Sequence, residues 1–119
     1  MREILRDLRQ RFGVRGALLL SNEGVVVAAD LNRDLTADSV AALACAVLRE
    51  ARNSSEKLSL GPLRRMILTA SSGRLLFEPL GDLVLVVATV PEIDLEQTLL
   101  EITGPARRIR GLSRLDSAS

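Results

Sequence analysis

The sequence predicts a single α/β domain of the α+β type, in which a hairpin and a three-stranded meander supply a sheet with helices on both faces. Apolar residues recur at helical spacing in one long segment, from about Thr36 to about Lys57. Apolar runs joined by short turns flank this helix, as a hairpin before it and a three-stranded meander after it. A chain of 119 residues is one domain by length and is large enough to form a single core.

The N-terminal part predicts a short helix and then the hairpin. Over residues 2–12, the apolar residues recur at helical spacing: Ile4, Leu5, Leu8 and Phe12. Gly13 is expected to end this helix, and the strands are expected at Val14–Ser21 and residues 25–29, joined by the turn Asn22-Glu23-Gly24. Neither strand alternates with polar residues, so both are expected to be covered on two faces, by helices above and below the sheet.

The long helix is expected to begin after Thr36 as N-cap and to lie on the sheet through one apolar side. That side is expected to contain Val40, Leu43, Ala44, Val47, Leu48 and Ala51. The far side is charged except at Ala42 and Ala46, where a free surface helix more often carries long polar side chains. These two alanines either allow a second helix to pack closely or face water as good helix formers.

The meander is predicted at three segments, Leu63–Ala70, Gly73–Pro79 and Asp82–Val90. The last segment is the most apolar and is expected to be central in the sheet, whereas Arg64 and Arg65 indicate that the first is an edge strand.

A final helix is predicted to follow. Asp94 is its expected N-cap, Gln97 would complete a capping box, and Gly104-Pro105 is expected to end the helix. Its apolar stripe is expected to contain Leu95, Leu99 and Ile102. Residues 106–115, which include Arg107, Arg108, Arg110 and Arg114, form either a short second helix with Ile109 inward or a loose basic tail. The predicted domain covers residues 1–115, and residues 116–119 form a short C-terminal tail.

The composition argues against catalysis and against most ligands. Without histidine, no Ser-His or Cys-His pair can form, and one cysteine cannot complete a zinc site. No calcium loop, phosphate-binding glycine-rich loop or dinucleotide-binding turn occurs. We therefore expect a protein that is not an enzyme and has no metal or cofactor.

A net charge of +1 and the absence of Trp and Tyr argue against nucleic acid as a partner. No secretory signal or bilayer-spanning apolar run occurs, so we expect a cytoplasmic protein without membrane insertion. Cys45 is expected to be a small buried thiol without a redox role.

The order of elements resembles the Roadblock family, the dynein light chain type of domain related to longin domains. The residues that carry this resemblance are strand 16–21 with its turn 22–24 and return Val25-Val26, the alanine-rich helix Ser39–Ala51, and strand 81–87. The resemblance implies a five-stranded antiparallel sheet of order 2-1-5-4-3, with the long helix on one face and the two terminal helices on the other. It also implies a homodimer in which the third strands and the long helices of two subunits meet. The implied dimer or partner interface contains Ala42, Ala46, Arg49, Asn53, Arg65, Ile67 and Thr69.

The same resemblance implies a platform or regulator for Ras-like small GTPases. A GTPase-activating protein can order the catalytic residues of the GTPase or lend an arginine. The candidates for a lent arginine are Arg49, Arg52 and Arg65, each of which can equally be a solubilising surface charge. The alternatives are a small-molecule sensor domain, which needs a polar-lined pocket, and a structural subunit of a motor-type complex.

Overall fold

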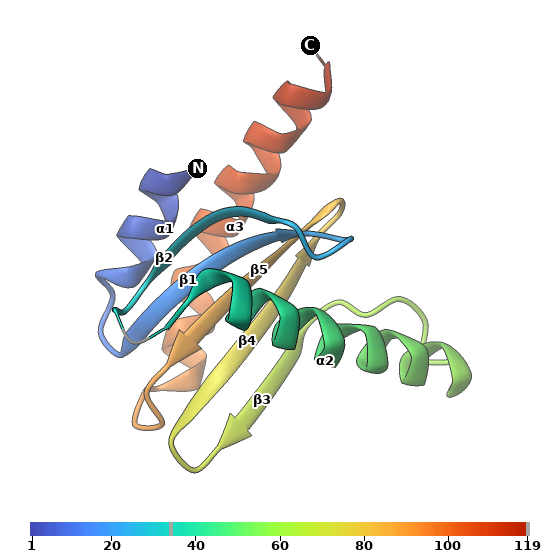
Figure 1. The fold of residues 1–119 in the computed structure, drawn as a ribbon, viewed down its shortest axis with the longest axis horizontal. Coiled ribbons are helices and arrows are strands. Elements are labelled where there is room, and N and C mark those ends of the chain that lie inside the picture. The colour runs from blue at the N-terminus through green and yellow to red at the C-terminus, as the bar shows by residue number, and fades with distance from the viewer. Residues whose placement is uncertain (34, 119) are drawn as a thin grey trace.

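The structure, a computed structural model, describes residues 1–33 and 35–118, with side chains through Ser113. Its elements are α1 (Arg2–Arg9), β1 (Val14–Ser21), β2 (Val26–Leu31), α2 (Ala37–Lys57), β3 (Met66–Ala70), β4 (Gly73–Leu80), β5 (Leu83–Thr89) and α3 (Leu95–Ala118). The strands form one antiparallel sheet of order β2-β1-β5-β4-β3. Helix α2 lies on one face, and α1 and α3 lie on the other (Figure 1). The predicted fold and strand order are confirmed.

The sheet separates two apolar cores. On the α2 face, the buried residues include Leu18, Leu20, Phe77, Val84 and Val86. On the opposite face, Leu19, Leu76, Leu85 and Val87 pack against side chains of α1 and α3. Neighbouring residues of β1 and β5 therefore enter different cores, which is why these central strands are apolar without alternation. Strand β2 departs from that expectation, because it is an edge strand and Val27 is exposed.

Helix α2 begins after Thr36 as predicted, although the Thr36 side chain makes no capping hydrogen bond. Its buried residues are Ala41, Ala44, Leu48 and Ser55. The prediction that Leu43 faces the sheet is wrong, because this side chain is 70% exposed, and Val47 is 36% exposed. Ala41 and Ala44 are small enough to let the helix backbone approach the sheet, and each residue advances the helix by about 100°. With the alanines against the sheet, Leu43 is left at the flank of the helix.

The turn between β1 and β2 packs against α2. Gly24 has a φ of +89°, and a Cβ atom there would lie 2.9 Å from the Sγ atom of Cys45. Both the backbone angle and the close approach therefore require glycine. Cys45 is half-buried at this contact, so the expectation of a buried thiol holds only in part.

Helix α1 ends at Arg9, earlier than predicted, and Phe12 is 85% exposed instead of continuing the apolar stripe. The chain has to reverse between α1 and β1, and Gly13 does this with a φ of +80°. A Cβ atom at Gly13 would lie 2.3 Å from a methyl group of Ile93, so the residues before β1 are constrained by the loop that precedes α3. The turn leaves Phe12 outside the core.

Helix α3 continues through Gly104-Pro105, so the predicted break is wrong. Proline removes one helical hydrogen bond and strains the preceding turn. The apolar stripe nevertheless keeps its spacing across the proline, with Ile102, Ala106 and Ile109 in the core under the sheet. Burial of Ile109 thus outweighs the local cost, and of the two alternatives for residues 106–115 the helix is correct.

The start of α3 agrees with the prediction in part. The Asp94 side chain accepts a hydrogen bond from the Gln97 backbone N–H (3.2 Å), whereas the Gln97 side chain donates to Glu101 and does not return to the cap. Residues 116–118 continue the helix, and Ser119 lies outside the described residues, so the division into a domain of residues 1–115 and a tail stays a prediction. None of the described helices combines the length and apolar character needed to cross a membrane.

Ala44→Glu should destabilise the fold, because Ala44 is 2% exposed and its Cβ atom meets the sheet. An unpaired buried charge costs about 3–5 kcal/mol, which lowers the Tm by roughly 10 °C or more. Ala46→Glu is the matched control, because Ala46 is exposed on the same helix, and its subunit should keep its fold and helical circular dichroism. Equal losses of thermal stability in the two variants would contradict the described orientation of α2, when circular dichroism is measured at a concentration where light scattering finds wild type and both variants monomeric.

Candidate interaction surface

Helix α2 covers only part of its face of the sheet. Five strands about 4.8 Å apart span about 20 Å, whereas a helix with its side chains is about 10 Å wide. Two helices, α1 and α3, cover one face, but α2 alone lies on the other, where its backbone is closest to β1 and β2 (Figure 1). The β3–β4 end of this face therefore lacks a helix.

A groove of about 410 Å³ marks the uncovered area. One flank of α2 and the β3–β4 hairpin line it, together with residues of β1, β2, β5 and the loop before α2. Its apolar lining includes Val40, Leu43, Val47, Leu68 and Leu75. Leu43 and Val47 are the exposed residues described above, and Leu68 is 44% exposed. We call Leu43, Val47 and Leu68 the apolar strip. Three large apolar side chains around one groove are typical of a surface that another molecule covers.

Arg74 adds a polar feature to this groove. It lies in β4 and lines the groove, and its Nε atom is buried without a hydrogen-bond partner in the described part of the chain. An unsatisfied buried donor costs about 1–3 kcal/mol. An acceptor from outside the subunit would relieve this cost.

Strand β3 borders the groove and is an edge of the sheet. Among the described residues it pairs only with β4, so its outer backbone N–H and C=O groups have no strand partner there. Met66 packs on the α2 side and Ile67 on the opposite side. By strand alternation Leu68 shares the α2 face with Met66, whereas Thr69 shares the other face with Ile67.

Six of the seven predicted interface residues consequently fall into two groups, and Arg65 lies before β3. Four exposed residues lie along one side of α2: Ala42, Ala46, Arg49 and Asn53. Ile67 and Thr69, in contrast, belong to the sheet face of α1 and α3, although the β3 backbone that carries them borders the groove. Whether these residues contact a partner stays a prediction. The residues of the apolar strip were not among the predicted interface residues. Strand alternation around Ile67 would have indicated Leu68 as a residue of the opposite face.

The three candidate arginines differ in their contacts. Arg65 precedes β3 and donates two hydrogen bonds to Glu78 of β4, from Nε to Oε2 (2.7 Å) and from Nη2 to Oε1 (3.0 Å). These bonds raise the pKa of Arg65, against a smaller lowering by burial. Arg52 donates to Oδ1 of Asn22 (3.3 Å), in the turn after β1. Arg49 is exposed and makes no hydrogen bond or ion pair within the described residues. Arg49 alone of the three is therefore available to a partner.

A wider hollow of about 1090 Å³ lies between the end of α2, the loop before β3 and the β4–β5 turn. Its charged lining consists of Arg52, Arg64, Arg110, Glu56 and Glu78. This is the polar lining that a sensor domain would need, but the two signs of charge nearly balance, so no single class of ligand is favoured. Among the described residues, no group of three or more cysteine or acidic side chains is placed to hold a metal ion.

Comparison with known proteins relates the whole architecture to one family. A family model described as the Roadblock/LC7 domain matches residues 2–89, from α1 to the end of β5. The uncharacterized protein MJ0714 of Methanocaldococcus jannaschii is 26% identical over 109 residues, which are 92% of each chain. A second protein of that archaeon, MJ1340, is 24% identical over 92% of this chain and 96% of its own.

Solved structures share the fold over nearly the whole chain. The Roadblock/LC7 domain from Streptomyces avermitilis has a TM-score of 0.87 and 23% identity, covering 96% of this chain and 98% of that one. MglB of Myxococcus xanthus has a TM-score of 0.88 at 13% identity, covering 95% and 94% of the two chains. At these sequence identities, the structural similarity shows a shared fold alone.

Arg65→Ala should lower the free energy of unfolding by about 0.5–1 kcal/mol, because it removes a doubly hydrogen-bonded but partly exposed ion pair with Glu78. Arg49→Ala removes an arginine without such a partner and should change stability by much less. Urea denaturation of both variants measures the difference. A larger loss for Arg49→Ala than for Arg65→Ala would contradict the assignment of these contacts.

Proposed function

Because the chain belongs to the Roadblock/LC7 family, we propose that it is a homodimeric, non-enzymatic interaction module that binds a Ras-like small GTPase and regulates or scaffolds it. The observation that carries this proposal is the apolar strip of Leu43, Val47 and Leu68, exposed beside the unpaired edge of β3. Such a combination of apolar side chains and free backbone groups suits a protein partner.

A second copy of the chain supplies the missing cover. If two β3 strands pair antiparallel, the two-fold axis that relates them is perpendicular to the sheet. The same rotation places both α2 helices on one face of a ten-stranded sheet, beside each other above the two β3 strands. Leu43 and Val47 would then be buried between the helices, and Ala42 and Ala46 would allow a close backbone approach. The dimer thus accounts for the exposure of large apolar residues and for the small residues beside them.

The GTPase would bind the face that carries the two α2 helices. The resemblance of the sequence to the Roadblock family suggests this class of partner, and Arg49 and Asn53, which follow Ala42 and Ala46 along the same side of α2, offer it exposed polar side chains beside the helix–helix contact. Arg52 and Arg65 are engaged within the subunit, so Arg49 is the candidate for an arginine lent to the GTPase. The sequence lacks histidine and a phosphate-binding loop, which supports a module without catalysis of its own.

The protein should be a dimer at micromolar concentration by multi-angle light scattering. Leu43→Glu and Ala46→Glu should each raise the dimer Kd by about a hundredfold or more, because each places two unpaired charges in the interface. Leu100→Glu is the matched control, since Leu100 is 72% exposed on α3, on the opposite face of the sheet. A wild-type monomer would contradict the proposed dimer. If Ala46→Glu alone leaves the dimer intact, that side of α2 faces solvent and the interface lies elsewhere.

Binding to a panel of purified Ras-like GTPases, loaded with GDP or a GTP analogue, should identify a partner by calorimetry. Ala46→Glu should weaken that binding. Arg49→Ala should preserve binding, but if Arg49 is the lent arginine it should lower the stimulation of GTP hydrolysis by roughly a thousandfold. The chain by itself should neither bind nor hydrolyse GTP or ATP. Nucleotide turnover that persists through further purification would contradict the assignment as a non-enzyme, and failure to bind any GTPase would contradict the assigned partner.

A further inference from the structure

The charges of the chain are segregated, although its net charge is only +1. Residues 1–11 and 104–112 contain seven of the 16 basic residues but two of the 15 acidic residues, which gives these segments a net charge of +5. All other residues together carry −4. The two basic segments are α1 with its following turn and the second half of α3, which lie in one layer of the fold, whereas the first half of α3 in the same layer carries Glu96 and Glu101.

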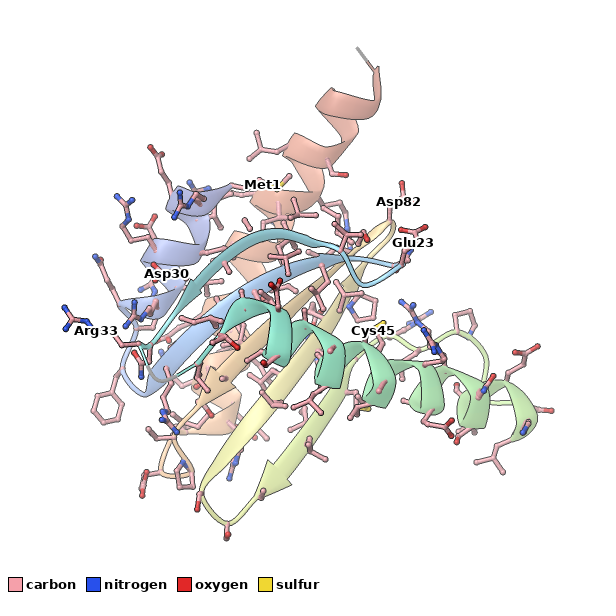
Figure 2. The ribbon with its side chains drawn as sticks, in the orientation of Figure 1. Met1, Glu23, Asp30, Arg33, Cys45 and Asp82 are labelled. Atoms are coloured by element: carbon pink, nitrogen blue, oxygen red, sulfur yellow. The ribbon has the colours of Figure 1, made fainter. Side chains whose placement is uncertain are left out.

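The fold brings these segments side by side. Met1, Ile4 and Leu112 line a groove between α1 and α3, and a second groove farther along α1 involves Gln10 and Pro105. The helices also lie together on the same face of the sheet in Figure 2. Five exposed arginines of this layer form what we call the basic face: Arg2, Arg6, Arg11, Arg107 and Arg108.

Helix dipoles explain only part of this pattern. They favour acidic residues at a helix start and basic residues at its end, which accounts for Glu96 near the start of α3 and for Arg6 in the last turn of α1. They do not favour Arg2 at the start of α1, beside the basic half of α3. The only ion pair found between the described side chains of the two helices joins Arg108 to Asp7 at 3.7 Å, and both side chains are more than half exposed. The basic face is therefore largely uncompensated within the subunit.

The surface between the arginines contains glycines, which have no side chain, and is partly apolar. Gly104 and Gly111 lie in α3, and a Cβ atom added at either would meet nothing within 4 Å, so packing does not require glycine there. Both glycines weaken the helix relative to alanine, but they leave its outer side open to close approach. Leu100 and Leu112 are exposed on the same helix. Leu112 lies among the arginines, whereas Leu100 lies between Glu96 and Glu101. Arginines beside an exposed leucine suit a lipid headgroup region better than a nucleic-acid backbone.

The proposed dimer sets the geometry of the two basic faces. A two-fold axis perpendicular to the sheet keeps the α1 and α3 layers of both subunits on one side, opposite the α2 helices. The two basic faces then lie on the same side of the dimer, where α1 covers β1 and β2 toward either end of the ten-stranded sheet, so a flat polyanion can contact both simultaneously. We propose that this surface, which rests on the proposed dimer, binds peripherally to a lipid bilayer that contains anionic lipids, leaving the α2 face free for the protein partner.

The test is sedimentation of the full chain with vesicles. Wild type should bind vesicles of phosphatidylcholine with about one-third phosphatidylglycerol at about 0.1 M salt, should not bind pure phosphatidylcholine, and should be released at about 0.5 M salt. The double variant Arg6→Glu/Arg107→Glu should lose roughly tenfold or more in partitioning, because four charges per dimer are reversed. Arg33→Glu/Arg64→Glu is the matched control, with the same change of net charge at exposed residues outside the basic face, and should bind nearly as wild type does.

Light scattering on the same samples separates this inference from the proposed function. A dimer that does not bind anionic vesicles, or that loses binding equally in both double variants, overturns the inference and leaves the dimer standing. A monomer that binds through Arg6 and Arg107 supports the basic face and overturns the dimer. Displacement from the vesicles by an equal phosphate concentration of duplex DNA would overturn the bilayer as the preferred partner.

Discussion

One helix cannot cover a five-stranded sheet, and this constraint organises the molecule. Helices α1 and α3 together cover one face, whereas α2 alone lies on the other, drawn close to the sheet by Ala41 and Ala44. The remaining part of the α2 face carries the apolar strip of Leu43, Val47 and Leu68 beside an unpaired strand edge. In the proposed dimer the second copy supplies the missing helix, and the α1 and α3 layers lie on the opposite side with their arginines outward.

Sequence patterns predicted what local interactions determine. The continuous apolar character of β1 and β5 indicated strands buried on two faces, and both strands are central in the sheet. Turn chemistry located the hairpin at Gly24, where a positive φ is required. Asp94 was recognisable as a helix cap because a capping side chain acts within its own helical turn. The order of these elements was sufficient to indicate the family and, through it, the strand order.

The sequence predictions that failed concern features that tertiary packing determines. Periodicity located the apolar residues of α2 but not its rotation on the sheet, which depends on how closely Ala41 and Ala44 approach, so Leu43 was assigned to the wrong side. Pro105 stays in a helix because Ile109, four residues later, is fully buried against the sheet. In β3 neighbouring residues lie on opposite faces of the sheet, so Leu68 lines the groove while Ile67 packs on the α1 and α3 side, and contact of Ile67 with a partner stays a prediction. The contacts of a partner lie outside the chain and cannot be derived from its own patterns.

Hydrogen exchange of the β3 backbone tests the central claim most directly. The outward-pointing amides of residues 66–70 have no partner in the subunit, and in the proposed dimer they bond to the second β3 strand. Exchange of the β3 peptide should therefore slow as concentration rises through the wild-type dimer Kd, and should stay fast in Ala46→Glu over the same concentrations. Exchange that is independent of concentration while light scattering reports a dimer would contradict pairing through β3.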